Sequence, residues 1–289
     1  MVADLTESLS RLRAVVERCL PCLIACSGGI DSLLLATLAH RWAAGRTVVV
    51  HAIGPAVPEA ATQRVRDWAS REGWNLRAID AGEYDDPRYR ANPIDRCYHC
   101  KSHLYGALSA LRRALTPPEG TLLSGANCDD LHEYRPGLRA AAEAGVVHPF
   151  VEAGIGKSDI RQIARALALP FADLPASPCL ASRFYTGTPV AADVLRAVDR
   201  AEQAIRTLTG IRVVRCRIRD DWMWIETEAA DRAAIDRRVL EEIEKVVCSE
   251  TAKITHVFLD PAPYASGRAT NAIVTVQSPP PHSSGKGLP

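Results

Sequence analysis

The sequence predicts an α/β protein in which a parallel sheet, covered by helices on both faces, is followed by a smaller α+β domain. Short apolar runs alternate with helical patterns through the first two-thirds of the chain, which is typical of parallel strands joined by crossover helices. After about residue 187 the order changes to helix, hairpin, helix and strands. A length of 289 residues also suits two domains of about 150 residues each.

The first domain is expected to span residues 1–187. Apolar runs of strand length occur at residues 20–26, 47–52, 76–80 and 121–124. Patterns of helix length occur at residues 32–44, 59–72, 98–115 and 158–167. Strands that alternate with helices in this way indicate a Rossmann-like parallel sheet.

The second domain is expected to span residues 188–276. A charged helix at 191–208 precedes strands at 213–219 and 222–227, a helix at 230–247, and strands near 254–259 and 272–276. The last residues, 277–289, contain the string SPPPHSSGKGLP. This composition predicts a disordered tail.

Composition and charge exclude several classes of protein. The hydrophobic fraction of 47% and the charged fraction of 24% exclude wholesale disorder. Lys and Arg number 35 against 34 Asp and Glu, a net charge of +1, so no overall field favours nucleic acid or an anionic membrane as a partner.

The protein is expected to be cytoplasmic. No run approaches the roughly 18 apolar residues of a membrane helix, and the acidic residues Asp4, Glu7 and Glu17 are unlike a signal peptide. The nine cysteines are therefore interpreted as thiols, metal ligands or catalytic groups before disulfides are considered.

A glycine-rich motif joins the first expected strand to the first helix. It reads Ser27-Gly28-Gly29-Ile30-Asp31-Ser32. Two glycines let a backbone approach an anion, and the helix N-terminus directs its N–H groups at it. The two serines add hydroxyl donors, and Asp31 can hold Mg²⁺. The alternative is a glycine-rich turn in which Asp31 is only the helix N-cap.

This SGG-x-DS motif resembles the signature of the PP-loop ATP pyrophosphatases. Members of that superfamily cleave ATP between the α and β phosphates and adenylate a substrate. A Walker A loop does not fit, because no lysine follows the glycines at the required spacing.

Three cysteines form a second candidate site. Cys97 and Cys100 make a C-x-x-C pair, and Cys179 stands far away in a proline-containing loop. Together they could bind a metal or an iron–sulfur cluster. A redox pair and ordinary structural thiols remain alternatives. Arg183, four residues after Cys179, could lower the pKa of this thiol or simply lie on the surface.

The other six cysteines are expected to be small buried residues, as free cysteines often are. They are Cys19, Cys22, Cys26, Cys128, Cys216 and Cys248.

Four separated segments resemble the LarE-type ATP-dependent sulfur transferases, which build the thiocarboxylates of a nickel-pincer nucleotide cofactor. They read SGGIDS, RCYHCKSHLY, SGANCDDLHEYRPGLRAAAEAGV and ASPCLASRFYTGTPV, within residues 20–205. The resemblance implies that ATP and Mg²⁺ bind at Ser27–Ser32, with Asn127 and Asp130 near the nucleotide. A substrate carboxylate would be adenylated, and sulfur would then attack its acyl carbon.

The family occurs in two forms, and Cys179 is common to both. In one form this cysteine surrenders its own sulfur and ends as dehydroalanine. In the other, three cysteines hold a 4Fe–4S cluster that carries the transferred sulfide. Because Cys97, Cys100 and Cys179 are all present, we favour the cluster form.

Arginines are the candidates for substrate binding. Arg215 and Arg217 alternate along an expected strand, so both face one side and suit a phosphate. Their positions also match the phosphate-binding arginines of the family. The alternative is a solvent-facing strand edge. Arg135 and Arg183 are further anion-binding candidates. Glu202 is expected on a helix surface, with a position facing the active site as the alternative.

The chain departs from the family pattern near its end. An arginine is expected where the chain has Ala265, and Arg268 appears instead after Gly267. The resemblance implies a pyridinium dicarboxylate mononucleotide as the substrate, and this departure leaves a related small carboxylate as the alternative.

The sequence thus predicts an AMP- and pyrophosphate-forming sulfur transferase. Expected partners are the small carboxylate, a sulfur-donor protein and further copies of the chain. The alternatives are a tRNA-thiolating or amide-forming PP-loop ATPase, or a non-catalytic nucleotide- or redox-sensing cluster protein.

Overall fold

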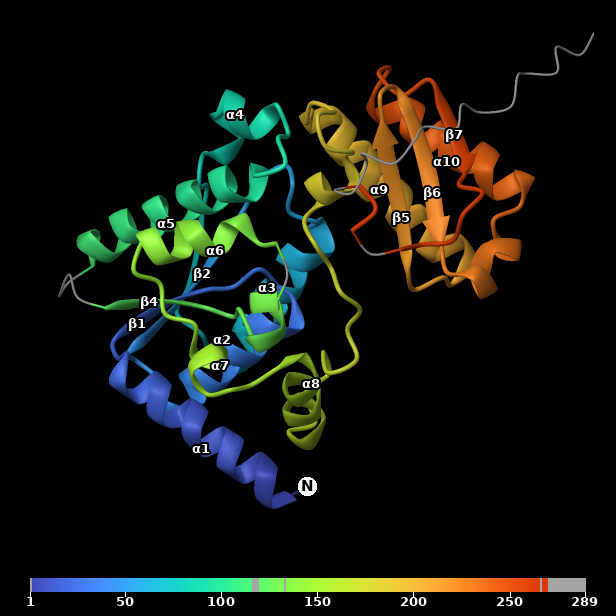
Figure 1. Ribbon diagram of the computed structural model, residues 1–289. Helices are drawn as coiled ribbons and strands as arrows, with labels where there is room; N and C mark the ends of the chain where they lie inside the picture. The colour runs from blue at the N-terminus through green and yellow to red at the C-terminus, as the bar shows by residue number, and fades with distance from the viewer. Residues whose placement is uncertain (1, 116–119, 133, 266, 270–289) are drawn as a thin grey trace, which may run out of the picture.

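Two β-sheets organise the chain in the computed structural model, which describes residues 2–115, 120–132, 134–265 and 267–269 (Figure 1). The first sheet has four strands and the second has three. In the described residues, no helix is long and apolar enough to cross a membrane.

The four-stranded sheet is parallel throughout, as predicted. Its strands are β1 (Cys22–Ala25), β2 (Thr47–Ala52), β3 (Leu76–Ile79) and β4 (Thr121–Ser124), in the order β3-β2-β1-β4. The chain steps from β1 to β2 to β3 in one direction and returns to the other side of β1 for β4. The strand order therefore reverses between β1 and β4, where ligands bind in Rossmann-like sheets.

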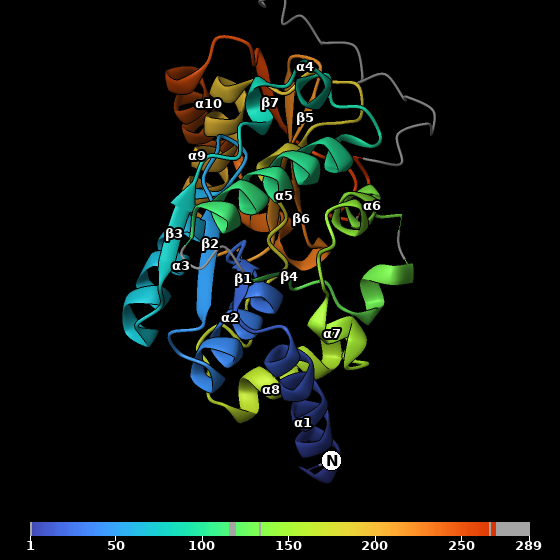
Figure 2. The same ribbon diagram turned by 90° about the vertical axis from the view of Figure 1, so that its left-hand side faces the viewer.

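Helices cover both faces of this sheet (Figures 1 and 2). One face carries α1 (Val2–Arg18), α2 (Ile30–Trp42), α3 (Glu59–Glu72), α7 (Pro149–Glu152) and α8 (Lys157–Ala166). The other carries α5 (Arg96–Ala114) and α6 (Pro136–Glu143). Ile24 packs on the first face and its neighbour Leu23 on the second, because successive strand residues point to opposite faces.

The remaining helices of this first part are short. They are α4 (Pro87–Arg90) and the 3₁₀ segments Glu83–Asp85, Cys128–His132 and Leu180–Arg183.

The three-stranded sheet has one antiparallel and one parallel pair. It contains β5 (Val214–Arg219), β6 (Trp222–Thr227) and β7 (His256–Leu259), and α9 (Ala192–Thr209) and α10 (Arg237–Glu250) pack against it. The helix expected at 230–247 begins later than predicted. Ala229–Ala234 forms a 3₁₀ segment, and the Asp236 side chain caps α10 by accepting from the Val239 N–H (2.9 Å). The expected strand 272–276 and tail 277–289 lie outside the described residues.

The second core includes residues that precede the expected domain boundary. Leu180, Ala181 and Phe184 pack with α9 and β5, and Phe184 forms a bridge with Ile218. A boundary near residue 187 stays a prediction.

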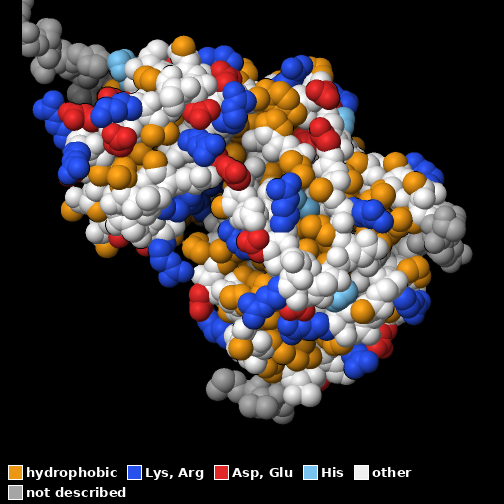
Figure 3. Space-filling view, turned by 180° about the vertical axis from the view of Figure 1, so that it is seen from behind, with side chains coloured by type: hydrophobic (Ala, Val, Ile, Leu, Met, Phe, Trp, Pro, Cys, Tyr) orange, Lys and Arg blue, Asp and Glu red, His pale blue; other side chains and the backbone are white. Residues whose placement is uncertain are grey.

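Seen from behind, acidic and basic side chains are interspersed, and a notch separates the two lobes (Figure 3).

Candidate active site

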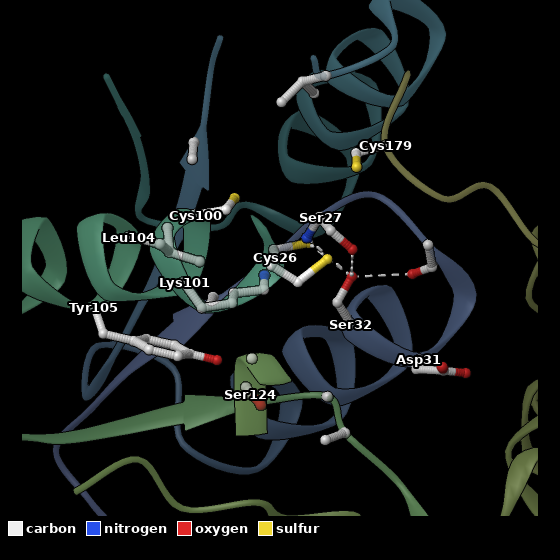
Figure 4. Close-up of a pocket in the computed structure, with 18 of the residues that line it drawn as sticks. Cys26, Ser27, Asp31, Ser32, Cys100, Lys101, Leu104, Tyr105, Ser124 and Cys179 are labelled. Atoms are coloured by element: carbon white, nitrogen blue, oxygen red, sulfur yellow. Dashed lines mark hydrogen bonds between the residues drawn. The ribbon is translucent and has the colours of Figure 1, made fainter. Parts of the chain in front are cut away.

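A cavity of about 530 Å³ lies at the carboxyl ends of β1, β2 and β4. Its size suits a small-molecule ligand, and its place matches the point where the strand order reverses. Ser27, Lys101 and Cys179 come from three separate segments to surround one space (Figure 4).

The glycine-rich motif forms the turn between β1 and α2. Gly28 has φ +80°, and a Cβ there would lie 2.8 Å from the Ala61 carbonyl oxygen, so only glycine fits. The Ser32 hydroxyl accepts from the Ser27 N–H (3.1 Å) and contacts the Gly29 carbonyl oxygen (3.1 Å). Gly29 is the N-cap of α2, without a side-chain cap. The alternative in which Asp31 caps the helix is therefore wrong.

Asp31, Asn127 and Asp130 meet at one side of this turn. The Asn127 amide donates to the Asp31 carboxylate (3.3 Å), and Asp130 pairs with Arg135 (2.9 Å) and Lys157 (3.2 Å). Burial and the negative charge of Asp130 raise the pKa of Asp31 to about 6, against the opposing charge of Lys157. The ionised Asp31 carboxylate is unfavourable here unless a cation lies beside it. This fits Mg²⁺, which commonly takes one or two carboxylates together with substrate phosphates.

Cys97, Cys100 and Cys179 line the same cavity. Cys97 and Cys179 are exposed and Cys100 is half-buried, and burial raises the pKa of Cys100 to about 12. No three His, Cys, Asp or Glu side chains in the described part of the chain are grouped so that they could hold a metal ion. In a 4Fe–4S cluster each thiolate binds a different iron, and cysteine is the ligand type that such a cluster takes. The cluster stays a prediction.

The predicted arginines separate into two groups. Arg135 lines the cavity. Arg183, Arg215 and Arg217 do not: they are buried, with 2%, 4% and 5% of their surface exposed. The interpretation of Arg215 and Arg217 as a solvent-facing edge is therefore wrong. Their substrate role stays a prediction.

Glu202 corrects a second expectation. It is only 1% exposed and forms a bidentate ion pair with Arg183 (2.8 and 2.9 Å), so it does not lie on a helix surface. Arg268, which follows the departure from the family pattern, pairs with Glu226 (2.9 Å). Arg217 bonds the same carboxylate (3.1 Å).

The remaining cysteines follow the prediction in part. Cys19, Cys22, Cys26 and Cys216 are buried, whereas Cys128 is half-buried and Cys248 is exposed. Cys26 also lines the cavity, next to the turn.

Lys101 is a cavity residue that the motifs did not single out. It extends from α5 toward Cys26 and Ser27 (Figure 4), and it shares a helix face with Leu104 and Leu108, which are buried. A lysine within an apolar stripe of helical spacing was the signal that could have found it. Gly125 and the buried Glu83 also line the cavity and carried no comparable signal.

The fold defines a Rossmann-like α/β protein with a cavity at the reversal of strand order. No model of a known protein family matches the chain. An uncharacterized protein of Synechocystis is 37% identical over 226 residues, which cover 78% of this chain and 82% of that protein. A second uncharacterized protein, from Methanocaldococcus jannaschii, is 31% identical over 184 residues, 64% of this chain and 69% of that protein.

A third relative carries a functional name. The pyridinium-3,5-bisthiocarboxylic acid mononucleotide synthase of Lactiplantibacillus plantarum is 28% identical over 281 residues, which cover 96% of this chain and 98% of that protein. The chain belongs to the family of LarE-type sulfur transferases.

Proposed function

We propose that this protein is an ATP-dependent sulfur transferase that converts a carboxylate of a pyridinium mononucleotide into a thiocarboxylate and releases AMP and pyrophosphate. One observation carries the proposal: the glycine-rich turn and Cys179 face the same cavity. A nucleotide at the turn and a sulfur at position 179 are then within reach of one substrate. The named relative, whose product is a bisthiocarboxylic acid mononucleotide, supports this substrate class.

The first step activates the carboxylate. A carboxylate oxygen attacks the α phosphorus of ATP, the bond to the β phosphate breaks, and pyrophosphate leaves. The N–H groups at the start of α2 bind phosphate oxygens. Mg²⁺ held at Asp31 neutralises phosphate charge when it is bound. Lys101 and Arg135, which line the cavity, add positive charge for the anionic substrates.

The second step replaces oxygen by sulfur. A sulfur nucleophile attacks the acyl carbon, the bond from that carbon to the bridging oxygen breaks, and AMP leaves with this oxygen. AMP is a far better leaving group than the oxygen of a free carboxylate, so adenylation is what makes the attack feasible.

The sulfur has two possible sources, and both involve Cys179. If the cysteine donates its own sulfur, it loses its α proton and its Cβ–S bond and becomes dehydroalanine. The protein mass then falls by roughly 34 Da, whereas oxidation would add mass. If Cys97, Cys100 and Cys179 hold a 4Fe–4S cluster, protein purified without oxygen contains about four iron atoms per chain. Iron content and whole-protein mass after turnover therefore distinguish the two sources.

A pyrophosphate assay tests the proposal. The protein is incubated with ATP, Mg²⁺ and pyridinium dicarboxylate mononucleotide, and pyrophosphate release is measured with and without the carboxylate. Release that depends on the carboxylate is expected. Formation of ADP and phosphate instead would contradict the proposal, and so would release that depends on tRNA or ammonia. The sulfur-donor protein and the homo-oligomer stay predictions.

A further inference from the structure

The loop that carries Cys179 is held through its backbone by buried arginines. Arg215 donates to the Ala176 carbonyl (2.6 Å) and Arg217 to that of Ser182 (3.0 Å). Arg96, from the turn of α5 next to Cys97, donates to the Ala181 carbonyl (2.6 Å). These cations hold loop carbonyls from both lobes of the molecule.

Arg183 makes the contacts nearest to the sulfur. One of its guanidinium nitrogens donates to the carbonyl oxygens of Pro178 (2.8 Å) and Cys179 (3.2 Å). The other side of the guanidinium forms the bidentate pair with Glu202 on α9. A planar guanidinium has fixed donor directions, so its orientation on Glu202 determines where these two carbonyls lie.

Glu202 is itself fixed by the second core. It accepts from the Cys216 N–H of β5 (3.1 Å) and pairs with Arg206 (2.8 Å). Burial raises the pKa of Glu202, but the charge and hydrogen bonds of Arg183 outweigh burial and leave this pKa below its ordinary value. The Glu202 carboxylate therefore stays ionised and keeps its ion pair with Arg183.

The loop is also tied to the first sheet. The Leu180 N–H donates to the Ala56 carbonyl oxygen (2.8 Å), in the segment that follows β2. Cys179 is thus held from the second core on one side and from the cavity wall on the other, while its side chain remains exposed to the cavity.

We propose that Arg183, oriented by Glu202, is a positioning residue that holds Cys179 at the distance and angle needed for sulfur transfer. Neither side chain needs to touch the substrate, and neither lines the cavity. The inference rests on the proposed function. It predicts that loss of the pair uncouples the two steps, because, among the described residues, no hydrogen bond or ion pair joins Arg183 or Glu202 to the glycine-rich turn that is proposed to bind ATP.

The test replaces the pair while the fold is kept. Breaking one partner of a buried pair leaves a buried charge, whereas removing both charges is far better tolerated. The double variant Arg183→Met with Glu202→Gln removes both charges and leaves an amide oxygen for the Cys216 N–H. Carboxylate-dependent pyrophosphate release and thiocarboxylate formation are measured on the same samples. We expect pyrophosphate release within about threefold of the unmodified protein and thiocarboxylate formation reduced roughly 100-fold, the scale of a misplacement by about 1 Å.

Two further variants keep the outcome interpretable. Arg200→Gln changes an exposed arginine of the same helix as Glu202, which pairs with Glu250 (3.9 Å), and it should transfer sulfur at the normal rate. Arg183→Lys keeps the charge but lacks the planar guanidinium, so it should release pyrophosphate normally and form little thiocarboxylate. This variant tests the positioning role even if the double variant does not fold. Equal losses in both assays, or normal transfer by Arg183→Lys and the double variant, would overturn the positioning role. Failure of the unmodified protein to release pyrophosphate would instead overturn the proposed function.

Discussion

Asp31 lies in the cavity with its pKa raised to about 6 by burial and by Asp130. A raised pKa means that the folded chain binds this proton more tightly than the unfolded chain does. The contribution of the carboxyl group to stability is therefore complete below the ordinary value of 3.8 and is lost as the pH rises through about 6. At neutral pH the ionised group destabilises the ligand-free protein.

Replacing Asp31 should make the ligand-free protein more stable and weaken its binding of Mg²⁺-ATP. We expect Asp31→Asn to raise the free energy of unfolding by roughly 1 to 3 kcal/mol at pH 7.5 and to gain nothing at about pH 3.5, as measured by urea denaturation. The same variant should lose at least about tenfold in affinity for Mg²⁺-ATP, measured by calorimetry. Asp67→Asn, on an exposed part of α3, is the control. A variant less stable than the unmodified protein at pH 7.5 would refute this assignment.

Cys179 separates the two steps of the reaction. Cys179→Ser should keep carboxylate-dependent pyrophosphate release and form no thiocarboxylate, because a hydroxyl neither donates sulfur nor holds the cluster. Assays of both products on one sample check this. Cys248→Ser, which changes an exposed cysteine of α10, should behave normally. Undiminished thiocarboxylate formation by Cys179→Ser would be incompatible with either source of sulfur.

Single residues show where sequence reasoning reaches its limit. The glycine-rich turn was predictable because its chemistry lies within six consecutive residues. The partnership of Arg183 and Glu202 was not, since it joins residues 19 apart across a loop and a helix, and nothing local distinguishes Glu202 from a solvent-exposed helix residue. Glu202 is buried because α9 packs on β5, and the local sequence does not predict that contact.

At the scale of elements, the end of β4 packs against the first turn of α2. A Cβ on Gly125 would lie 2.9 Å from the Ser32 backbone nitrogen, closer than real contacts allow. We expect Gly125→Ala to cost about 1–3 kcal/mol of stability and to weaken ATP binding, because the start of α2 must move. Denaturation and calorimetry measure the two effects.

Gly106→Ala is the matched control for this substitution. Gly106 lies inside α5 with open space where a Cβ would lie, so alanine should stabilise the helix by about 0.5–1 kcal/mol. ATP affinity should not change. If both alanine variants bound ATP as the unmodified protein does, the close approach of β4 to α2 would have no role in the site.

The strands of the parallel sheet and most of the long helices were predicted well, but the 17-residue helix α1 was not among the expected helices. A strand that is buried on both faces of the sheet requires a continuous apolar run such as Cys22–Ala25, and such runs stand out in a sequence. Short helices such as Pro136–Glu143 were missed, since eight residues give too little periodicity. The helix expected at 230–247 was misplaced because capping by Asp236, rather than hydrophobic spacing, determines its start.

At the scale of the whole molecule, the segment that follows Cys179 packs in the second core. Leu180 and Phe184 are each 2% exposed and pack in the second core. A fragment of residues 1–187 would lose these partners, at about 1.5–3 kcal/mol for each exposed side chain. We expect it to bind a hydrophobic dye more strongly than a fragment that ends at residue 175. A fragment 1–187 that unfolds at the same urea concentration as the full chain, without binding dye, would contradict this dependence on the second core.

The central claim is that ATP activates a carboxylate that is then attacked by sulfur at position 179. The most direct test uses pyridinium dicarboxylate mononucleotide labelled with ¹⁸O in its carboxyl groups, with AMP analysed by mass spectrometry after turnover. The account predicts AMP that carries a heavy oxygen, taken from the carboxylate, for each thiocarboxylate formed. Unlabelled AMP beside a labelled phosphate or ADP would show that the carboxylate never bonded to the α phosphorus, and the account would be wrong.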